Sequence, residues 1–177
     1  MVSIENIKKL RQMTNISISE CKKALEEAQD DLNKALKILK ERGAQIAKKK
    51  EKRATRAGLI SAYIHFGGRV GSLVEVNCET DFVSQNEIFK NFAKDIALQV
   101  TAAAPLYIKK EDVPKQDLEK ALSEGIDEAE FYKENCLLEQ DFIKDPSITV
   151  KDYLNSVIAK LGENIIIKRF VRFEVSD

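Results

Sequence analysis

The chain has 177 residues, of which 44% are hydrophobic and 33% are charged, with only 7 Gly and 3 Pro. This composition excludes a disordered or fibrous chain and is typical of a globular protein with one or two domains. The net charge is zero, yet residues 1–56 contain 15 Lys and Arg against 8 Asp and Glu. We therefore expect two units with different surfaces, one basic and one acidic.

The amino terminus, MVSIENIKKLRQM, has charges among its apolar residues and no continuous apolar segment. It therefore does not resemble a signal peptide or a membrane span, and we expect a cytoplasmic protein without membrane contact. Cys21, Cys78 and Cys136 are widely spaced and form no CxxC pair. This spacing predicts buried free thiols instead of a disulfide framework or a zinc site.

Residues 1–43 predict a bundle of three short helices. Ser3 is the expected cap of the first helix, and Ser17 with Glu20 has the spacing of a capping box for the second. Asp30 is expected to open the third helix, and Gly43 to end it in the left-handed conformation. The predicted inner stripes are Ile4, Ile7 and Leu10; Ile18, Cys21, Leu25 and Ala28; and Leu32, Ala35, Leu36 and Leu39.

Residues 44–57 form a basic segment with a single acid, Glu51. Its bases are Lys48, Lys49, Lys50, Lys52, Arg53 and Arg56. One interpretation is a solvated linker, and the other is a surface that contacts RNA or phosphate. We favour the linker because no aromatic residue interleaves the charges, as a base-stacking surface would require.

A hairpin is predicted where residues 59–66 and 69–76 flank Gly67 and Gly68, a pair suited to a two-residue type I′ turn. A long helix is expected from Ser84 to Ala104. Ser84 and Glu87 have capping-box spacing, which would make Val83 and Ile88 a hydrophobic staple.

If Val83 fixes the entry of the chain into the long helix, Phe82 points elsewhere. The pattern leaves two alternatives for this aromatic side chain in a predicted loop. It folds back over the edge of the sheet, or it is exposed for a partner.

The second half of the chain predicts helices over residues 115–123, 127–135 and 149–161, the last capped by Thr149 and followed by Gly162. Residues 165–175 then alternate as a half-buried strand, with Ile165, Ile167, Val171, Phe173 and Val175 on one face. The expected fold is α+β, in which a basic linker over residues 44–57 joins a three-helix bundle (1–43) to a core (58–177) with a three-stranded antiparallel sheet.

Catalytic chemistry has little support in this sequence. The lone histidine, His65, lies near the hairpin turn, and no nucleophile elbow, phosphate-binding loop or dinucleotide motif is present. Glu75, Glu79 and Asp81 could suggest a metal site, but strand alternation already explains Glu75. We therefore predict a binding protein that is not an enzyme and has no cofactor.

Three separated segments resemble one known family, elongation factor Ts. ETDFV preceded by LVEVNC is similar to its signature, LRQMT with CKKALEEA resembles its ubiquitin-associated-like amino-terminal domain, and GENIIIKRFVRFEV resembles its core. Where the family usually has Gly-Ala-Gly-Met-Met, residues 15–19 read Asn-Ile-Ser-Ile-Ser. The length matches the short form of the family.

The resemblance implies guanine nucleotide exchange on the translational GTPase elongation factor Tu. In the family, the Asp-Phe of the signature enters the GTPase near its magnesium ion and nucleotide, and the amino-terminal domain braces the same GTPase domain. The implied partner-binding residues are Thr80, Asp81, Phe82 and Val83 in the core, and Leu10, Arg11, Ile18 and Ser19 in the bundle. The resemblance also implies a homodimer that itself binds no nucleotide, nucleic acid or metal. The alternative function is an RNA-binding adaptor that uses the basic amino-terminal region.

Overall fold

The computed structural model describes residues 2–14 and 16–175, and it confirms the α+β class. The amino-terminal bundle consists of α1 (Ile4–Thr14), α2 (Ile18–Glu27) and α3 (Leu32–Lys50). The side chains buried between these helices form a core of their own, which is separate from the core of the sheet domain. They are Leu10, Cys21, Ala24, Leu25, Ala28, Ala35 and Leu39.

The starts of the three helices follow the predicted capping chemistry in part. The Ser3 hydroxyl accepts a hydrogen bond from the backbone N–H of Glu5 (3.2 Å), and the Ser17 hydroxyl accepts from Glu20 (3.2 Å). The cap of α3 is Asp31, not Asp30, because Asp30 has a left-handed φ of 66° that belongs to the preceding turn. Two predicted inner residues are also wrong: Ile4 and Ile18 are 73% and 54% exposed.

The helix end predicted at Gly43 is wrong, because α3 continues through it to Lys50. Gly43 is buried where α3 lies against α8 (Val150–Leu161), and a Cβ placed on it would meet the carbonyl oxygen of Asn155 at 3.7 Å. The small residue therefore serves the close approach of two helices. The Lys50 ammonium donates to the carbonyl of Gly162 (2.6 Å), so the end of α3 is also attached to the sheet domain.

The main sheet contains β1 (Ala57–Ile64), β2 (Val70–Cys78) and β5 (Ile165–Glu174), all antiparallel and in the order β1-β2-β5. The predicted hairpin is present, but its turn is longer than two residues. His65 pairs with Val70 through its backbone N–H (2.9 Å), and the N–H of Gly68 closes the turn onto the carbonyl of His65 (2.9 Å). Gly67 and Gly68 have φ angles of 90° and 71°, which require glycine.

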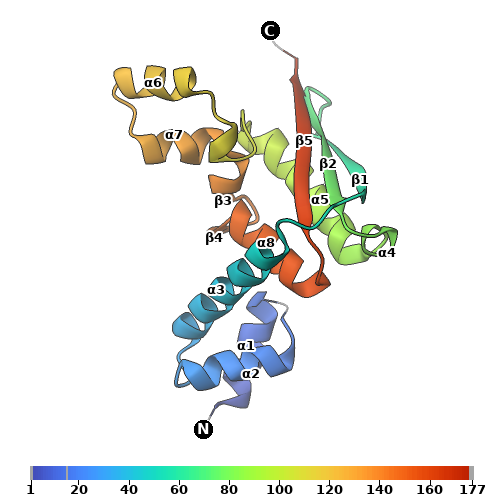
Figure 1. The fold of residues 1–177 in the computed structure, drawn as a ribbon, viewed down its shortest axis with the longest axis vertical. Coiled ribbons are helices and arrows are strands. Elements are labelled where there is room, and N and C mark those ends of the chain that lie inside the picture. The colour runs from blue at the N-terminus through green and yellow to red at the C-terminus, as the bar shows by residue number, and fades with distance from the viewer. Residues whose placement is uncertain (1, 15, 176–177) are drawn as a thin grey trace.

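One face of the sheet is covered by α5 (Glu87–Ala103), which α8 flanks (Figure 1). This packing forms the larger hydrophobic core. Its fully buried side chains include Val74, Val76, Phe89, Phe92, Ile96, Val100, Leu137 and Val150. Ser72 and Thr101 are buried in the same layer, and their hydroxyls share a hydrogen bond (3.0 Å) that satisfies both.

A register shift between Glu75 and Val76 changes which residues of β5 face inward. Ile165 and Ile167 are buried as predicted, but beyond the shift Phe170 and Arg172 lie on the inner face. Val171 and Phe173 are therefore on the outer face, 40% and 68% exposed, which corrects the single buried stripe predicted for this strand.

The remaining elements are η1 (Lys110–Asp112), α6 (Lys115–Ser123), α7 (Glu128–Asn135), η2 (Leu137–Glu139), β3 (Asp141–Phe142) and β4 (Asp145–Thr149). Of these, β3 and β4 lie beside α8, whereas α6 and α7 extend away from the sheet (Figure 1). The predicted helices in this half are confirmed. Thr149 caps α8, and Gly162 ends it with a φ of 73°.

Substitutions at Gly43 test the contact between α3 and α8. Gly43→Ala is expected to raise the free energy of unfolding by about 0.5–1 kcal/mol, since Ala favours a helix interior and its Cβ makes an ordinary contact. Gly43→Leu is expected to lower it, because the longer side chain meets the backbone of α8. Urea denaturation of both variants measures the two effects, and a destabilising Ala would contradict the proposed packing.

Candidate functional site

The segment after β2 forms a single helical turn, α4 (Asp81–Ser84). Thr80 is its cap, with the hydroxyl accepting from the backbone N–H of Val83 (3.4 Å). The cap predicted at Ser84 is therefore wrong. Ser84 is buried and its hydroxyl donates to the carbonyl of Asp81 (2.8 Å), while Asn86 caps α5 by accepting from the N–H of Ile88 (2.8 Å).

The turn separates the side chains of Phe82 and Val83, since successive helical residues point in different directions. Val83 is 5% exposed and joins the core, whereas Phe82 is 84% exposed beside the exposed Asp81. The staple predicted between Val83 and Ile88 is absent, because α5 starts later and Ile88 is 43% exposed. Of the two alternatives for Phe82, the structure shows the exposed aromatic.

Glu163, in the turn between α8 and β5, holds the start of α4 in place. One of its carboxylate oxygens accepts from the backbone N–H groups of Glu79 (3.1 Å) and Thr80 (3.0 Å). The other accepts from the Thr80 hydroxyl (2.6 Å). Sequence reasoning missed this residue because its partners lie more than 80 positions away in the chain.

Glu79 makes the reciprocal bond, accepting from the backbone N–H of Asn164 (2.6 Å), with the Arg53 guanidinium 3.6 Å from the same oxygen. The side-chain amide of Asn164 in turn donates to the carbonyls of Glu51 (3.2 Å) and Arg53 (2.8 Å). The loop before Phe82, the turn before β5 and the chain after α3 are thus joined in one network. We refer to Glu79, Thr80, Glu163 and Asn164 as the carboxylate brace.

Cys78, next to the carboxylate brace, is fully buried, and its thiol donates to the carbonyl of Thr80 (3.2 Å). Burial, followed by the nearby charge of Glu163, raises the pKa of the Cys78 thiol to about 11. Burial likewise raises the pKa of Cys136 to about 11 and increases that of Cys21. Protonated, buried thiols are poor nucleophiles, so this environment does not favour nucleophilic chemistry at the Cys78 thiol.

The bundle presents part of the predicted surface. Arg11, Ile18 and Ser19 are exposed, but Leu10 is fully buried among the helices and has no free side chain to contact a partner. Met13, 62% exposed, was not predicted as a site residue, although it lies two positions after Arg11. Asn15, where the sequence departs from the family pattern, lies outside the described residues.

A cavity of about 400 Å³ lies between the bundle and the sheet domain. Ile16 and Ser17, just before α2, line its bundle side, and Ile88, shortly after α4, lines its other side. Residues adjacent in sequence to the two predicted parts of the site therefore border one hollow, although none of the eight predicted site residues lines it.

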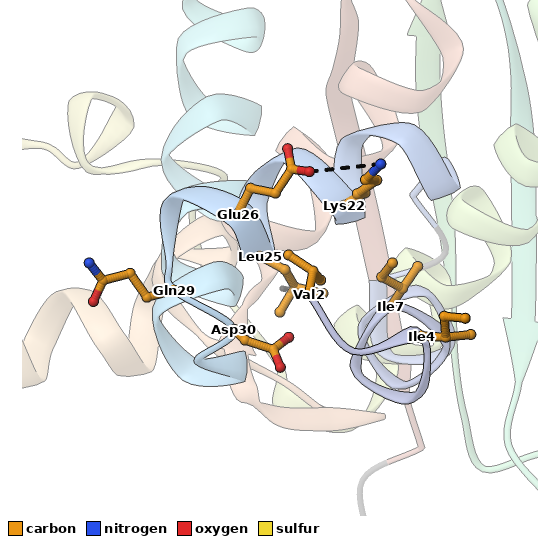
Figure 2. A pocket seen from close by; sticks show the side chains of 8 residues that line it. All are labelled: Val2, Ile4, Ile7, Lys22, Leu25, Glu26, Gln29 and Asp30. Atoms are coloured by element: carbon orange, nitrogen blue, oxygen red, sulfur yellow. Dashed lines mark ion pairs between the residues drawn. The ribbon is translucent and has the colours of Figure 1, made fainter.

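A second hollow, of about 740 Å³, lies on the bundle between α1 and α2 (Figure 2). Val2, Ile7 and Leu25 form its apolar side, and Lys22 and Glu26 form an ion pair (3.8 Å) along its rim. Asp30 already accepts a hydrogen bond from the backbone N–H of Ser3 (3.1 Å). These groups explain the fold of the bundle and do not form a catalytic constellation.

Within residues 2–14 and 16–175, no group of three or more His, Cys, Asp and Glu side chains is placed to hold a metal ion. Over the same described residues, none of the helices combines the length and apolarity needed to cross a membrane.

Comparison with known proteins agrees with the three segments quoted above. The family model described as Elongation factor TS matches residues 2–128 and 121–177. The chain belongs to the elongation factor Ts family. It is 53% identical to the elongation factor Ts of Thermoanaerobacter sp. (strain X514), over 98% of this chain and 95% of that protein.

Two further relatives show the same near-complete coverage. The chain is 48% identical to elongation factor Ts of Carboxydothermus hydrogenoformans, over 100% of this chain and 90% of the relative. It is 46% identical to the elongation factor Ts of Thermotoga neapolitana, over 99% of this chain and 98% of that protein. Membership of the elongation factor Ts family gives the protein a role as a translation elongation factor.

Glu163→Ala tests the carboxylate brace. Loss of three hydrogen bonds to a partly exposed carboxylate is expected to lower the free energy of unfolding by about 1–2 kcal/mol and to speed amide exchange at Glu79 and Thr80. Thermal unfolding and NMR-detected hydrogen exchange measure these effects. Glu163→Gln, which keeps one carbonyl acceptor, should lower the free energy of unfolding by less. Unchanged amide exchange at both Glu79 and Thr80 in Glu163→Ala would exclude the brace.

Proposed function

We propose that this protein is a guanine nucleotide exchange factor that promotes release of GDP from elongation factor Tu in the cytoplasm. The observation that carries the proposal is Phe82, a large apolar side chain that α4 holds 84% exposed, with Asp81 beside it. Such a side chain gains free energy only by inserting into a partner, since in the free protein it remains in water.

The energy of one inserted side chain is not sufficient. Burying a Phe contributes about 1.5–3 kcal/mol, whereas a thousandfold faster release of GDP requires roughly 4 kcal/mol of differential interaction. A wider interface that favours the nucleotide-free state must supply the rest, because equal affinity for both states shifts no equilibrium. By linkage, rebinding of nucleotide then expels the factor.

The bundle supplies that wider interface. Arg11, Met13, Ile18 and Ser19 lie on its exposed surface, and Ile16 and Ser17 border the same hollow as Ile88. Leu10 supports this surface from the core of the bundle and makes no direct contact. Because α3 runs without a break from the bundle to its contact with α8, both parts of the site engage the GTPase together.

A homodimer forms part of the proposal. The outer face of the sheet presents exposed apolar side chains from all three strands, and no described element packs against them. They are Ile60, Ile64, Leu73, Val171 and Phe173, with exposed fractions of 67%, 71%, 46%, 40% and 68%. A contiguous apolar face of this kind indicates an interface, and a second copy offers the same self-complementary patch.

The alternative function, an RNA-binding adaptor, receives less support. Two bases of the segment 44–57 already serve the fold: Lys50 donates to the carbonyl of Gly162, and Arg53 lies by Glu79 in the carboxylate brace. No aromatic side chain is present in this segment to stack on bases. The division into a three-helix domain (1–43), a basic linker (44–57) and a core domain (58–177) remains a prediction, as does the absence of bound nucleotide.

Phe82→Ala tests the exchange mechanism. The variant is expected to release a fluorescent GDP analogue from purified elongation factor Tu about 10- to 100-fold more slowly than the parent, since it loses the insertion energy of one Phe. Its unfolding midpoint should be unchanged, because the side chain is already 84% exposed. Stopped-flow fluorescence and thermal unfolding provide the two measurements.

Phe66→Ala is the matched control, since Phe66 is 98% exposed at the hairpin turn and lies outside the proposed site. It should retain the exchange rate of the parent. Equal rates for parent and Phe82→Ala would reject the role of Phe82, and no acceleration by the parent would reject the proposed function.

Leu73→Glu tests the dimer. A charge in the middle of the outer face is expected to convert a dimer into a monomer, because an unpaired carboxylate cannot be buried at an apolar interface without a large cost. Size-exclusion chromatography with light scattering measures the mass. Ile4→Glu, at a 73% exposed position on the bundle, should remain dimeric, and a monomeric parent would contradict the proposal.

A further inference from the structure

A groove runs along the free edge of β5, the last strand in the sheet order β1-β2-β5. Ile165, Ile166, Ile167 and Lys168 all line this cavity of about 710 Å³. A strand face would contribute alternate residues, so four consecutive residues show that the edge of the strand borders the groove. An edge carries backbone N–H and C=O groups that can pair with a further strand.

The floor of the groove is aliphatic and comes from elements already packed in the core. Leu154 and Ile158 of α8 are 8% and 3% exposed, and Ala47 of α3 packs against them. Ile108 and Leu138 complete the lining from the far side. A ligand that fits here therefore presents apolar groups toward the floor.

The rim of the groove is basic. Lys48 of α3, Lys109 before η1, Lys151 of α8 and Lys168 of β5 are all exposed and line the cavity from four separate segments. Among the residues that the structure describes, none of the four makes an ion pair. The two acids of the lining are Glu51 and Asp112, and Asp112 is engaged by the backbone N–H of Lys109 (3.3 Å).

We propose that this groove binds an acidic, extended segment of a partner protein, which adds to the sheet as a strand beside β5. Backbone pairing with the edge gives affinity, the aliphatic floor takes alternate apolar side chains, and the lysine rim attracts carboxylates. This surface uses neither α4 nor the apolar residues of the outer sheet face. The inference is therefore independent of the proposed exchange activity and of the dimer.

Two other occupants fit the groove less well. A second copy of β5 would place Lys168, Arg169 and Arg172 opposite an equally basic strand, and like charges on paired strands are destabilising. Single-stranded nucleic acid would require stacking surfaces, but the described residues of the lining include no aromatic side chain.

The experiment uses the full chain and a fluorescein-labelled peptide of alternating Glu and Val, with fluorescence anisotropy as readout. The peptide is expected to bind, and to bind more weakly as salt rises. Lys151→Glu with Lys168→Glu should reduce the affinity at least about tenfold, and so should Lys48→Glu with Lys109→Glu. Lys115→Glu with Lys120→Glu, the same charge change on α6, should leave it unchanged.

Strand addition has a separate signature in amide hydrogen exchange. Amides of Ile165–Lys168 that exchange fast in the free protein should become protected when the Glu–Val peptide binds. The proposal is overturned if they gain no protection, if the α6 control loses affinity as the groove variants do, or if a Lys–Val peptide binds equally well. Tighter binding of a single-stranded RNA oligonucleotide would overturn it in favour of nucleic acid.

Discussion

The packing of α5 on the inner face of the three-stranded sheet determines where every other element lies. Phe89, Phe92, Ile96 and Val100 are fully buried in this contact, which belongs to the larger of the two hydrophobic cores within the described residues. The helix α8 then docks beside α5 through Tyr153, whose ring lies edge-on to Phe92 with centroids 5.2 Å apart.

The contact between α8 and α5 combines apolar packing with a hydrogen-bonded polar group. The Tyr153 hydroxyl donates to the Asp95 carboxylate (2.9 Å), and burial raises the pKa of Tyr153, so the donor keeps its proton at neutral pH. With α8 fixed, α3 rests on it at Gly43, and the bundle takes its position from α3. The geometry of the amino-terminal surface therefore depends on a core that lies in another part of the chain.

The features predicted correctly from the sequence are those that depend on residues close together in the chain. Thr149 and Gly162 were assigned correctly because capping depends on residues within one turn. The helix cap predicted at Ser84 was wrong, although the spacing of Ser84 and Glu87 fits a capping box. Thr80 and Asn86 can also cap helices here, and they do so because Ser84 is buried. Sequence spacing cannot reveal which of several capping residues ends up in the core.

The other errors arose where the structure depends on contacts between residues distant in the sequence. Gly43 was assigned as a helix end because the local pattern contains no sign of Asn155, against which the glycine packs. The prediction of inward-facing residues in β5 was wrong beyond the register shift, because that shift arises from the pairing with β2. The carboxylate brace was missed for the same reason, while Phe82 and Asp81 were proposed as site residues from the family signature and not from physical pattern.

The single turn α4 has a consequence for kinetics. A flexible loop would lose conformational entropy each time it ordered on a partner, at roughly 1–2 kcal/mol for each residue fixed. Here Thr80 and Glu163 order the turn in the free protein, so that loss belongs to folding and is not repeated at each encounter. Under the proposed exchange function, Phe82 would therefore enter its partner as part of an already ordered turn, without a folding step that would slow association.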